Sequence, residues 1–188
     1  MQTAAPPAIL RMFRGDATQH YPVKQATWGF SMDKRYSVPI LSFAVETERQ
    51  NSVFPEDGGW HHNPRWGIDV WLPGLHAELL QPGCGFSIPS CYDDYTGEVY
   101  TNFHYDEHEG TEDNFIKVAD LSNDLLLVSI EGYIRHEHAS MRPTKITVDG
   151  EFRKLTPHPP INAMFGGRES LPPHDPPIGA IYHPPSKK

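Results

Sequence analysis

The amino-acid sequence predicts a mainly β protein, an antiparallel β-sandwich or barrel, with a jelly roll among the variants of that class. Three observations favour this. Several short segments alternate apolar and polar residues with a period of two. Clusters of turn-forming residues separate those segments. Helical signals are limited to one or two short turns. A chain of 188 residues suits one domain. We therefore expect an N-terminal extension at 1–8, a β domain at 9–156 and a C-terminal arm at 157–188.

The strongest strand signal lies at residues 114–138, which we interpret as a β-hairpin. In its second half Leu126, Val128 and Ile130 recur at every second position and therefore share one face of a strand. Residues 120–124 supply the side chains that a turn needs. The alternation predicts a strand with one face on a core and the other towards water.

The same signals predict six strands before this hairpin, at residues 9–14, 26–32, 41–45, 66–72, 86–88 and 98–105. Residues 48–64 are polar and rich in turn formers, so they predict a long loop, and residues 106–114 predict an acidic turn. Residues 76–80 are the best helical candidate. After the central hairpin, Asp149-Gly150 lies between two β-prone runs and predicts a second, tight hairpin, because glycine readily adopts a positive φ.

The end of the chain differs in composition, because nine of the 19 prolines lie in residues 157–188. Proline removes a backbone donor and favours extended conformations, so this segment cannot form the interior of a sheet. We expect either disorder or an extended arm laid on a surface. The apolar residues that would anchor such an arm are Ile161, Met164, Phe165, Ile178, Ile181 and Tyr182.

Composition excludes some classes of function. The net charge is -8 and the sequence has no basic stripe, which argues against nucleic-acid binding. No apolar run approaches the roughly 20 residues of a membrane helix, and no signal peptide is recognisable, so we expect a cytoplasmic protein. Cys84 and Cys91 are interpreted as reduced thiols, with a local disulfide across the intervening loop as the alternative.

The eleven histidines suggest two candidate metal sites. His104, Asp106 and His108 have the spacing that places three ligands on one side of a strand, although a solvated acidic loop is the simpler interpretation. His136 and His138 continue the apolar face of the central strand. A His-x-His pair is typical of jelly-roll metal sites, although both residues lie in a loop if the strand ends earlier. Imidazole and carboxylate together would suit Zn, Fe or Mn.

A third candidate site is an aromatic segment before the predicted strand at 66–72. Trp66 shares the face of Ile68 and Val70, so we assign it to the core. The residues left to contact a ligand or partner are Trp60, His61, His62, Arg65 and Trp71. Tryptophan and arginine are favoured at interfaces, and they are also compatible with packing under neighbouring loops.

The sequence has no nucleophile elbow, no P-loop and no dinucleotide fingerprint. We therefore favour a non-catalytic β domain that binds a protein partner or copies of itself. One alternative is a metal-dependent enzyme of jelly-roll or barrel type that uses a histidine cluster. The other is a carbohydrate-binding module that uses Trp60 and Trp71.

Overall fold

The computed structural model describes residues 8–33, 37–72, 74–92, 99–105, 108–134, 144–155 and 179–186. Within them the protein is mainly β, as predicted, and the only helical elements are two short 3-10 turns. The elements are β1 (Ile9–Arg14), β2 (Ala17–Asp33), β3 (Val38–Thr47), β4 (Gln50–Asn51), η1 (Pro55–Asp57), β5 (His61–His62), β6 (Arg65–Trp71), η2 (Ala77–Leu79), β7 (Gly85–Ile88), β8 (Thr101–His104), β9 (His108–Glu109), β10 (Thr111–Ser122), β11 (Leu125–Ile134), β12 (Thr144–Lys154) and β13 (Ile181–His183).

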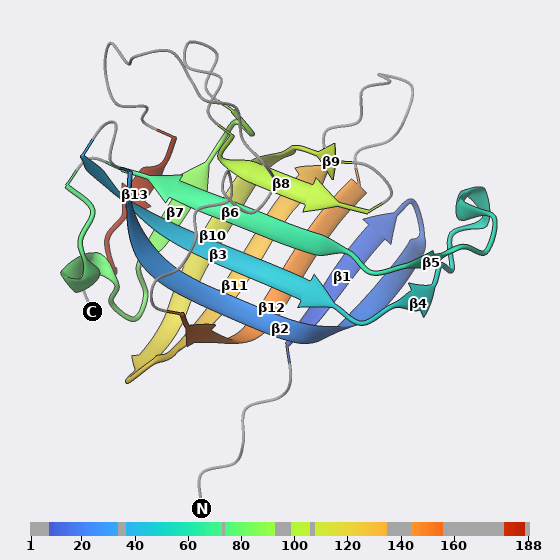
Figure 1. Cartoon of the computed structure of the whole chain (residues 1–188), viewed down its shortest axis with the longest axis horizontal. Coiled ribbons are helices and arrows are strands. Elements are labelled where there is room, and N and C mark those ends of the chain that lie inside the picture. The colour runs from blue at the N-terminus through green and yellow to red at the C-terminus, as the bar shows by residue number, and fades with distance from the viewer. Residues whose placement is uncertain are drawn as a thin grey trace, which may run out of the picture.

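One large, curled antiparallel sheet makes up the fold, with the strand order β13-β7-β10-β11-β12-β1-β2-β3-β6-β8-β9 (Figure 1). A short parallel contact between β12 and β2 adds to it. The two ends of the sheet approach each other. Thr101 on β8 donates from Oγ1 to the carbonyl oxygen of Thr111 at the start of β10, over 2.7 Å. Near β13, the Gly179 N–H donates to the carbonyl of Trp71 on β6. The sheet is therefore barrel-like.

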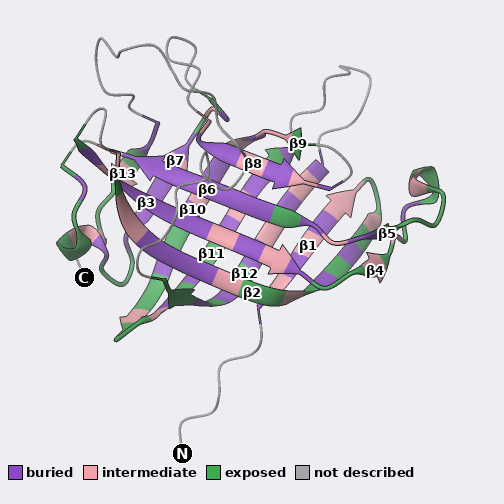
Figure 2. Cartoon of the chain, viewed as in Figure 1, coloured by how far each residue is buried: buried purple, intermediate pink, exposed green. Residues whose placement is uncertain are grey.

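Many strand residues of the sheet are buried (Figure 2), and their apolar side chains form one hydrophobic core. Phe43 on β3 and Phe152 on β12 meet edge to face, with ring centroids 5.9 Å apart. The buried Trp66 on β6 donates from its indole nitrogen to Thr111 Oγ1. Each such side chain contributes roughly 1.5–3 kcal/mol when fully buried. The core thus joins strands from far apart in the sequence.

The central hairpin is present as β10 and β11, paired from Ser122↔Leu125 to Thr111↔Ile134. Asn123 in the turn adopts φ 51°, which asparagine tolerates better than most residues. Leu126, Val128 and Ile130 face the core as the alternation predicted. The predicted residues 135–138 lie outside the described part of the chain.

The predicted hairpin at Asp149-Gly150 is wrong. β12 runs through both residues as one strand, in unbroken register with β11, and Gly150 pairs with Val128. Gly150 has φ 150°, and a β-carbon built on it would lie 2.5 Å from the β-carbon of Ala8. The glycine is therefore needed where the chain entering β1 crosses closely over β12.

Other boundaries differ because polar residues also form strands. Half of β2 lies before the predicted start at residue 26, the predicted loop at 48–64 contains the β4–β5 hairpin, and the predicted turn at 106–114 contains β9 and the start of β10. The strand predicted at 98–105 is shorter, at Thr101–His104. The helical candidate at 76–80 is the single turn η2.

Three further expectations concern the cysteines, the membrane and the arm. Cys84 and Cys91 are both buried and are not joined to each other, so the local disulfide does not form. None of the helical turns in the described ranges is long and apolar enough to cross a membrane.

Within the predicted arm, β13 is a short edge strand on β7. Ile181 is exposed there, whereas the Tyr182 ring packs 5.6 Å from that of Phe86. The expected anchors Ile161, Met164, Phe165 and Ile178 lie outside the described residues.

Candidate functional site

A small hairpin formed by residues 50–62 projects from one end of the curled sheet (Figure 1). β4 pairs with β5 through Gln50↔His62 and Asn51↔His61. Between them, η1 is followed by Gly58 and Gly59, both at positive φ, which glycine adopts without strain. Phe54 inserts into the core from this hairpin with only 2% of its surface exposed. The hairpin is thus docked on the sheet by an apolar side chain.

The base of the hairpin is also held by polar contacts from β2. Gln19 is buried, and its side-chain oxygen accepts a hydrogen bond from the Val53 N–H over 2.7 Å. Its side-chain nitrogen donates to the carbonyl of Asn51 over 3.3 Å. These bonds give two backbone groups of the hairpin a partner on β2.

Asp57, the last residue of η1, is the centre of a polar network at this end of the sheet. The carboxylate accepts a hydrogen bond from the Arg14 guanidinium over 2.7 Å and one from the Ser52 hydroxyl over 2.5 Å. It accepts a third from the Tyr105 hydroxyl. The Tyr105 hydroxyl lies 3.2 Å from that of Tyr21. Three segments that are distant in sequence, at Arg14, at residues 52–57 and at Tyr105, therefore meet at one carboxylate.

Aromatic contacts enclose the same network. The His62 ring stacks on the Tyr105 ring, with centroids 4.0 Å apart and planes 16° from parallel. His62 Nε2 lies 3.8 Å from an Asp57 carboxylate oxygen. The Arg14 guanidinium lies 4.6 Å from the centre of the Phe54 ring and 5.0 Å from that of Tyr105. These cation–π contacts hold the Arg14 guanidinium in place in addition to its ion pair with Asp57.

The network fixes the protonation of its two central groups. Burial by itself would raise the pKa of Asp57, but hydrogen bonds from Ser52 and Tyr105 and the charge of Arg14 outweigh it, and the pKa lies below its usual value. Burial and the hydrogen bond to Asp57 raise the pKa of Tyr105. At neutral pH, Asp57 is therefore ionised and Tyr105 is a protonated donor.

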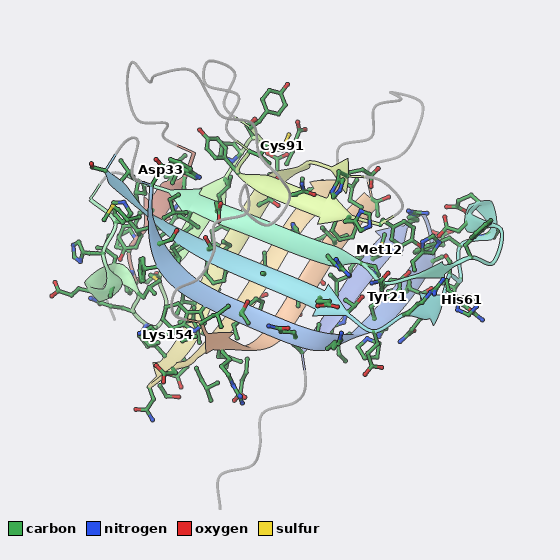
Figure 3. The ribbon with its side chains drawn as sticks, in the orientation of Figure 1. Met12, Tyr21, Asp33, His61, Cys91 and Lys154 are labelled. Atoms are coloured by element: carbon green, nitrogen blue, oxygen red, sulfur yellow. The ribbon has the colours of Figure 1, made fainter. Side chains whose placement is uncertain are left out.

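The polar network points inward, and the opposite side of the hairpin points to solvent. Only 7% of the Asp57 side chain is exposed. By contrast, Trp60 is 73% exposed and Val53 55% exposed, and His61 is exposed beside them. We call these three residues the hairpin tip. His61, with Tyr21 and Met12 nearby, is labelled at this end of the molecule in Figure 3.

The indole of Trp60 lies against the turn that follows η1. A β-carbon built on Gly58 would be 3.4 Å from Cδ1 of Trp60, in ordinary van der Waals contact. The backbone N–H of Trp60 donates to the carbonyl of Asp57, and the Trp60 carbonyl accepts from the backbone N–H of Ser52. The backbone that carries the exposed ring is therefore tied to the residues of the polar network.

The predicted aromatic segment is divided by the structure. Trp60 and His61 are exposed, and Arg65 is half exposed and 4.0 Å from Glu46. His62 is buried in the network. Trp71 is not on the surface as the prediction assumed, because only 1% of it is exposed. β6 is buried on both faces from Trp66 onwards, so alternation does not separate an outer face there.

The first predicted metal group is partly assembled. His104 and His108 lie opposite each other in the β8–β9 hairpin, with ring centroids 4.8 Å apart. Asp106 lies outside the described residues, as do His136 and His138 of the second group. Among the residues that the structure describes, no three histidine, cysteine, aspartate or glutamate side chains are grouped to hold a metal ion.

Sequence reasoning missed most of the polar network. Arg14 lies at the end of an apolar run, and Asp57 lies in a segment that was interpreted as loop. Tyr21 lies before Pro22 in a segment without a strand signal, and Tyr105 is the last residue of the strand predicted at 98–105. The sequence did offer one signal. Phe54 is an apolar residue directly before Pro55, and the acidic Asp57 follows in the same turn-forming segment.

Comparison with known proteins gives no relative: no family model, no curated protein and no solved structure matches this chain. The site therefore defines the protein only as a curled antiparallel sheet with a firmly docked hairpin that exposes an aromatic tip.

Proposed function

We propose that the protein is a non-catalytic binding module that uses the hairpin tip to contact a protein partner. The observation that carries this proposal is the combination at one hairpin of a buried, ionised Asp57 and a Trp60 that is 73% exposed. A large aromatic side chain left in water gains free energy when a partner covers it, and tryptophan is prominent among interface residues that dominate affinity.

The hydrogen bonds that fix the backbone of Trp60 support a binding role for its exposed side chain. Its backbone bonds to Asp57 and Ser52, and both belong to the buried network. A side chain that is positioned before the partner arrives loses less conformational entropy when it binds. The tip is therefore pre-organised, as in binding loops that are carried on a rigid scaffold.

The charge around the tip indicates the chemistry of the partner. Glu56 lies next to Asp57 in η1 with 59% of its side chain exposed, and the chain carries a net charge of -8. A partner with an apolar pocket rimmed by basic side chains fits this surface, because opposite charges speed association and disfavour other partners. A second copy of the chain has the same negative charge, so we favour a different protein over self-association.

We also propose a reducing, cytoplasmic setting for this partner. Cys84 and Cys91 are buried and form no disulfide, and burial raises the pKa of the Cys84 thiol. Free thiols that pack as apolar side chains are typical of proteins in reducing compartments.

The test compares Trp60→Ala with Met32→Ala, a matched control because Met32 is also a large exposed apolar residue, at 58%. Proteins retained by the wild type and by Met32→Ala but lost with Trp60→Ala would be purified, and their affinities measured at two salt concentrations. We expect Trp60→Ala to weaken binding by about 30-fold, the effect of losing roughly 2 kcal/mol at an interface hot spot. Added salt should weaken wild-type binding.

Two other outcomes would replace the proposal. The other three tryptophans, Trp28, Trp66 and Trp71, are buried, so an emission change on binding at the tip reports Trp60. If a glycan panel changes this emission while no protein depends on Trp60, a carbohydrate-binding module is the better description. If sedimentation shows a dimer that Trp60→Ala dissociates, the partner is a second copy.

A further inference from the structure

The edge of β7 is occupied by a segment of the same chain that comes from far along the sequence. Residues 179–186, which we call the docked segment, lie there, and β13 pairs antiparallel with β7 from Ile181↔Ser87 to His183↔Gly85. This is the arrangement of strand addition, in which an extended peptide joins the edge of a sheet and its side chains give specificity. The edge lies at the other end of the molecule from the hairpin tip (Figure 1).

The first two positions of the docked segment suit only small residues. The Gly179 N–H donates to the carbonyl of Trp71 over 3.1 Å. A β-carbon built on Gly179 would lie 2.7 Å from the ring of Tyr100, which is itself buried. Ala180 follows with only 3% of its surface exposed. A larger side chain at either position would have to displace buried atoms, which is costly in a packed interior.

The next two positions alternate between solvent and the protein. Ile181 is 58% exposed, so its side chain adds little to recognition. Tyr182 turns the other way, and its ring packs 5.6 Å from that of Phe86. The Tyr182 hydroxyl donates to the carbonyl of Leu79 over 3.3 Å. A tyrosine at this position is therefore held both by an apolar contact and by a hydrogen bond.

The fifth position is recognised through its imidazole ring. His183 Nε2 lies 2.7 Å from the hydroxyl oxygen of Ser87, a hydrogen-bond distance. The same ring meets the Phe115 ring edge to face, with centroids 5.7 Å apart. The contacts of the docked segment thus define the pattern Gly-Ala-x-Tyr-His, where x is a position open to solvent.

Charge also favours a segment of this kind. Residues 179–188 contain two lysines and no acidic residue, so of the net charge of -8 the first 178 residues account for -10. An extended segment flanked by basic residues is therefore attracted to the rest of the protein. A second copy is a poor source of such a segment, because its own residues 179–186 would first have to leave the edge that they occupy. A segment of a different protein does not carry that cost.

From these contacts we propose that β7 and the side chains beside it form a docking edge for an extended segment of a partner protein with the pattern Gly-Ala-x-Tyr-His. The chain's own docked segment occupies this edge when the partner is absent. Because it is attached to the same chain, it competes at an effective concentration that a partner must overcome. The docking edge consists of Leu79, Phe86, Ser87, Tyr100 and Phe115. It is independent of the hairpin tip and of the function proposed for it.

A fluorescent synthetic peptide of residues 179–188 tests the proposal on two forms of the full chain, the wild type and Gly179→Val/Tyr182→Ala. In the variant the attached segment no longer fits the edge, so it no longer competes. We expect the peptide to bind the variant at least about tenfold more tightly than the wild type, measured by fluorescence anisotropy. A peptide that carries Tyr182→Ala should bind at least about tenfold more weakly than the unchanged peptide. The matched control peptide carries Ile181→Ala at the exposed position and should bind as the unchanged peptide does.

A second measurement uses a chain whose docked segment keeps its contacts, so it does not depend on the folding of the double variant. Cys84 and Cys91 are buried, so a spin label reacts selectively with an Ile181→Cys variant, at an exposed position. Excess peptide should displace the docked segment and raise the mobility of the label, and the peptide with Tyr182→Ala should not.

Three results would overturn the proposal. One is equal affinity of the peptide for the two forms of the chain, and another is a label whose mobility the peptide does not change. The third is a wild-type dimer in sedimentation that Tyr182→Ala dissociates, because the edge would then bind the segment of a second copy rather than that of a different protein.

Discussion

Asp57 shows how one residue can link a surface hairpin to the body of a protein. A buried carboxylate is unfavourable unless its charge and its lone pairs are satisfied. Here Arg14 supplies the opposite charge, and Ser52 and Tyr105 supply hydrogen bonds. Any opening of the hairpin separates Asp57 from Arg14 and Tyr105, which belong to other segments. The cost of that separation holds the tip in place.

We predict that Asp57→Asn destabilises the fold by about 3 kcal/mol at pH 7, the low end for breaking a buried ion pair. The matched control is Asp149→Asn. Asp149 also lies 2.7 Å from an arginine, Arg11, but its side chain is 52% exposed, so the control should lose less than about 1 kcal/mol. Urea denaturation of both variants measures the difference. Equal losses would show that the network contributes no more than a surface ion pair.

The same variant has a pH dependence whose sign follows from the lowered pKa of Asp57. The pKa is lower in the folded than in the unfolded state, so the stabilisation is complete above the ordinary value of 3.8 and is lost as the pH falls through the folded value. The stability gap between wild type and Asp57→Asn should therefore shrink below about pH 4. A gap that widens on acidification would contradict this assignment.

Residue patterns in the sequence identified individual candidates but not their geometry. His104 and His108 were paired by their spacing on a supposed single strand, whereas the structure brings them together across a hairpin. Asp57 could not be distinguished, because an aspartate before two glycines has the composition of an ordinary turn. Its partner Arg14 lies 43 residues away, and no local pattern connects the two.

At the scale of elements, alternation located the strands with an apolar face and failed where both faces are polar or both buried. β4, β5 and β9 have only two residues each and carry no apolar stripe. In β6 both faces are buried, so the alternation that placed Trp66 in the core gave the wrong face for Trp71. Asp-Gly is a hairpin signal only when the chain reverses there, and at Gly150 a neighbouring segment requires the glycine instead.

Gly150→Ala tests that explanation. The new β-carbon would lie 2.5 Å from the Ala8 β-carbon, and φ 150° is itself unfavourable for alanine, so we expect a loss above about 2 kcal/mol. The matched control is Gly15→Ala, with φ 57° and nothing within 4 Å, which should lose only the ~1 kcal/mol of left-handed backbone. Thermal unfolding ranks the two. The Ala8 Cα would also lie 2.6 Å from the new β-carbon, so Ala8→Gly should not rescue the variant, and equal losses at Gly150 and Gly15 would refute the close approach as the cause.

At the scale of the whole molecule, the sequence predicts an antiparallel β-sandwich or barrel but not how the sheet closes. The closure depends on polar side chains that lie far apart in the chain. Trp66 donates to Thr111 Oγ1, which itself donates to Asn114 Oδ1 over 2.7 Å. Thr101 bonds the backbone of Thr111 from β8. Threonine and asparagine at a strand start resemble turn residues, so their burial in a seam between β6, β8 and β10 could not be anticipated.

Asn114 is the buried residue that joins this seam to β7. Only 1% of it is exposed, and its amide nitrogen donates to the carbonyls of Ile88 on β7 and Thr111 on β10. Asn114→Ala removes three hydrogen bonds and leaves space beside Gly132, so we expect a loss of about 2–3 kcal/mol. Asn51→Ala, at an exposed position of β4, should change stability by less than about 0.5 kcal/mol.

If the seam is part of one cooperative fold, far-ultraviolet and near-ultraviolet circular dichroism should report the same transition for Asn114→Ala, shifted to lower urea. The near-ultraviolet signal includes Trp66, whose indole bonds to the seam, while the far-ultraviolet signal averages over all strands. A near-ultraviolet transition that precedes the far-ultraviolet one would mean that the seam opens while the remaining sheet persists. The closure would then be a local contact rather than a condition for folding.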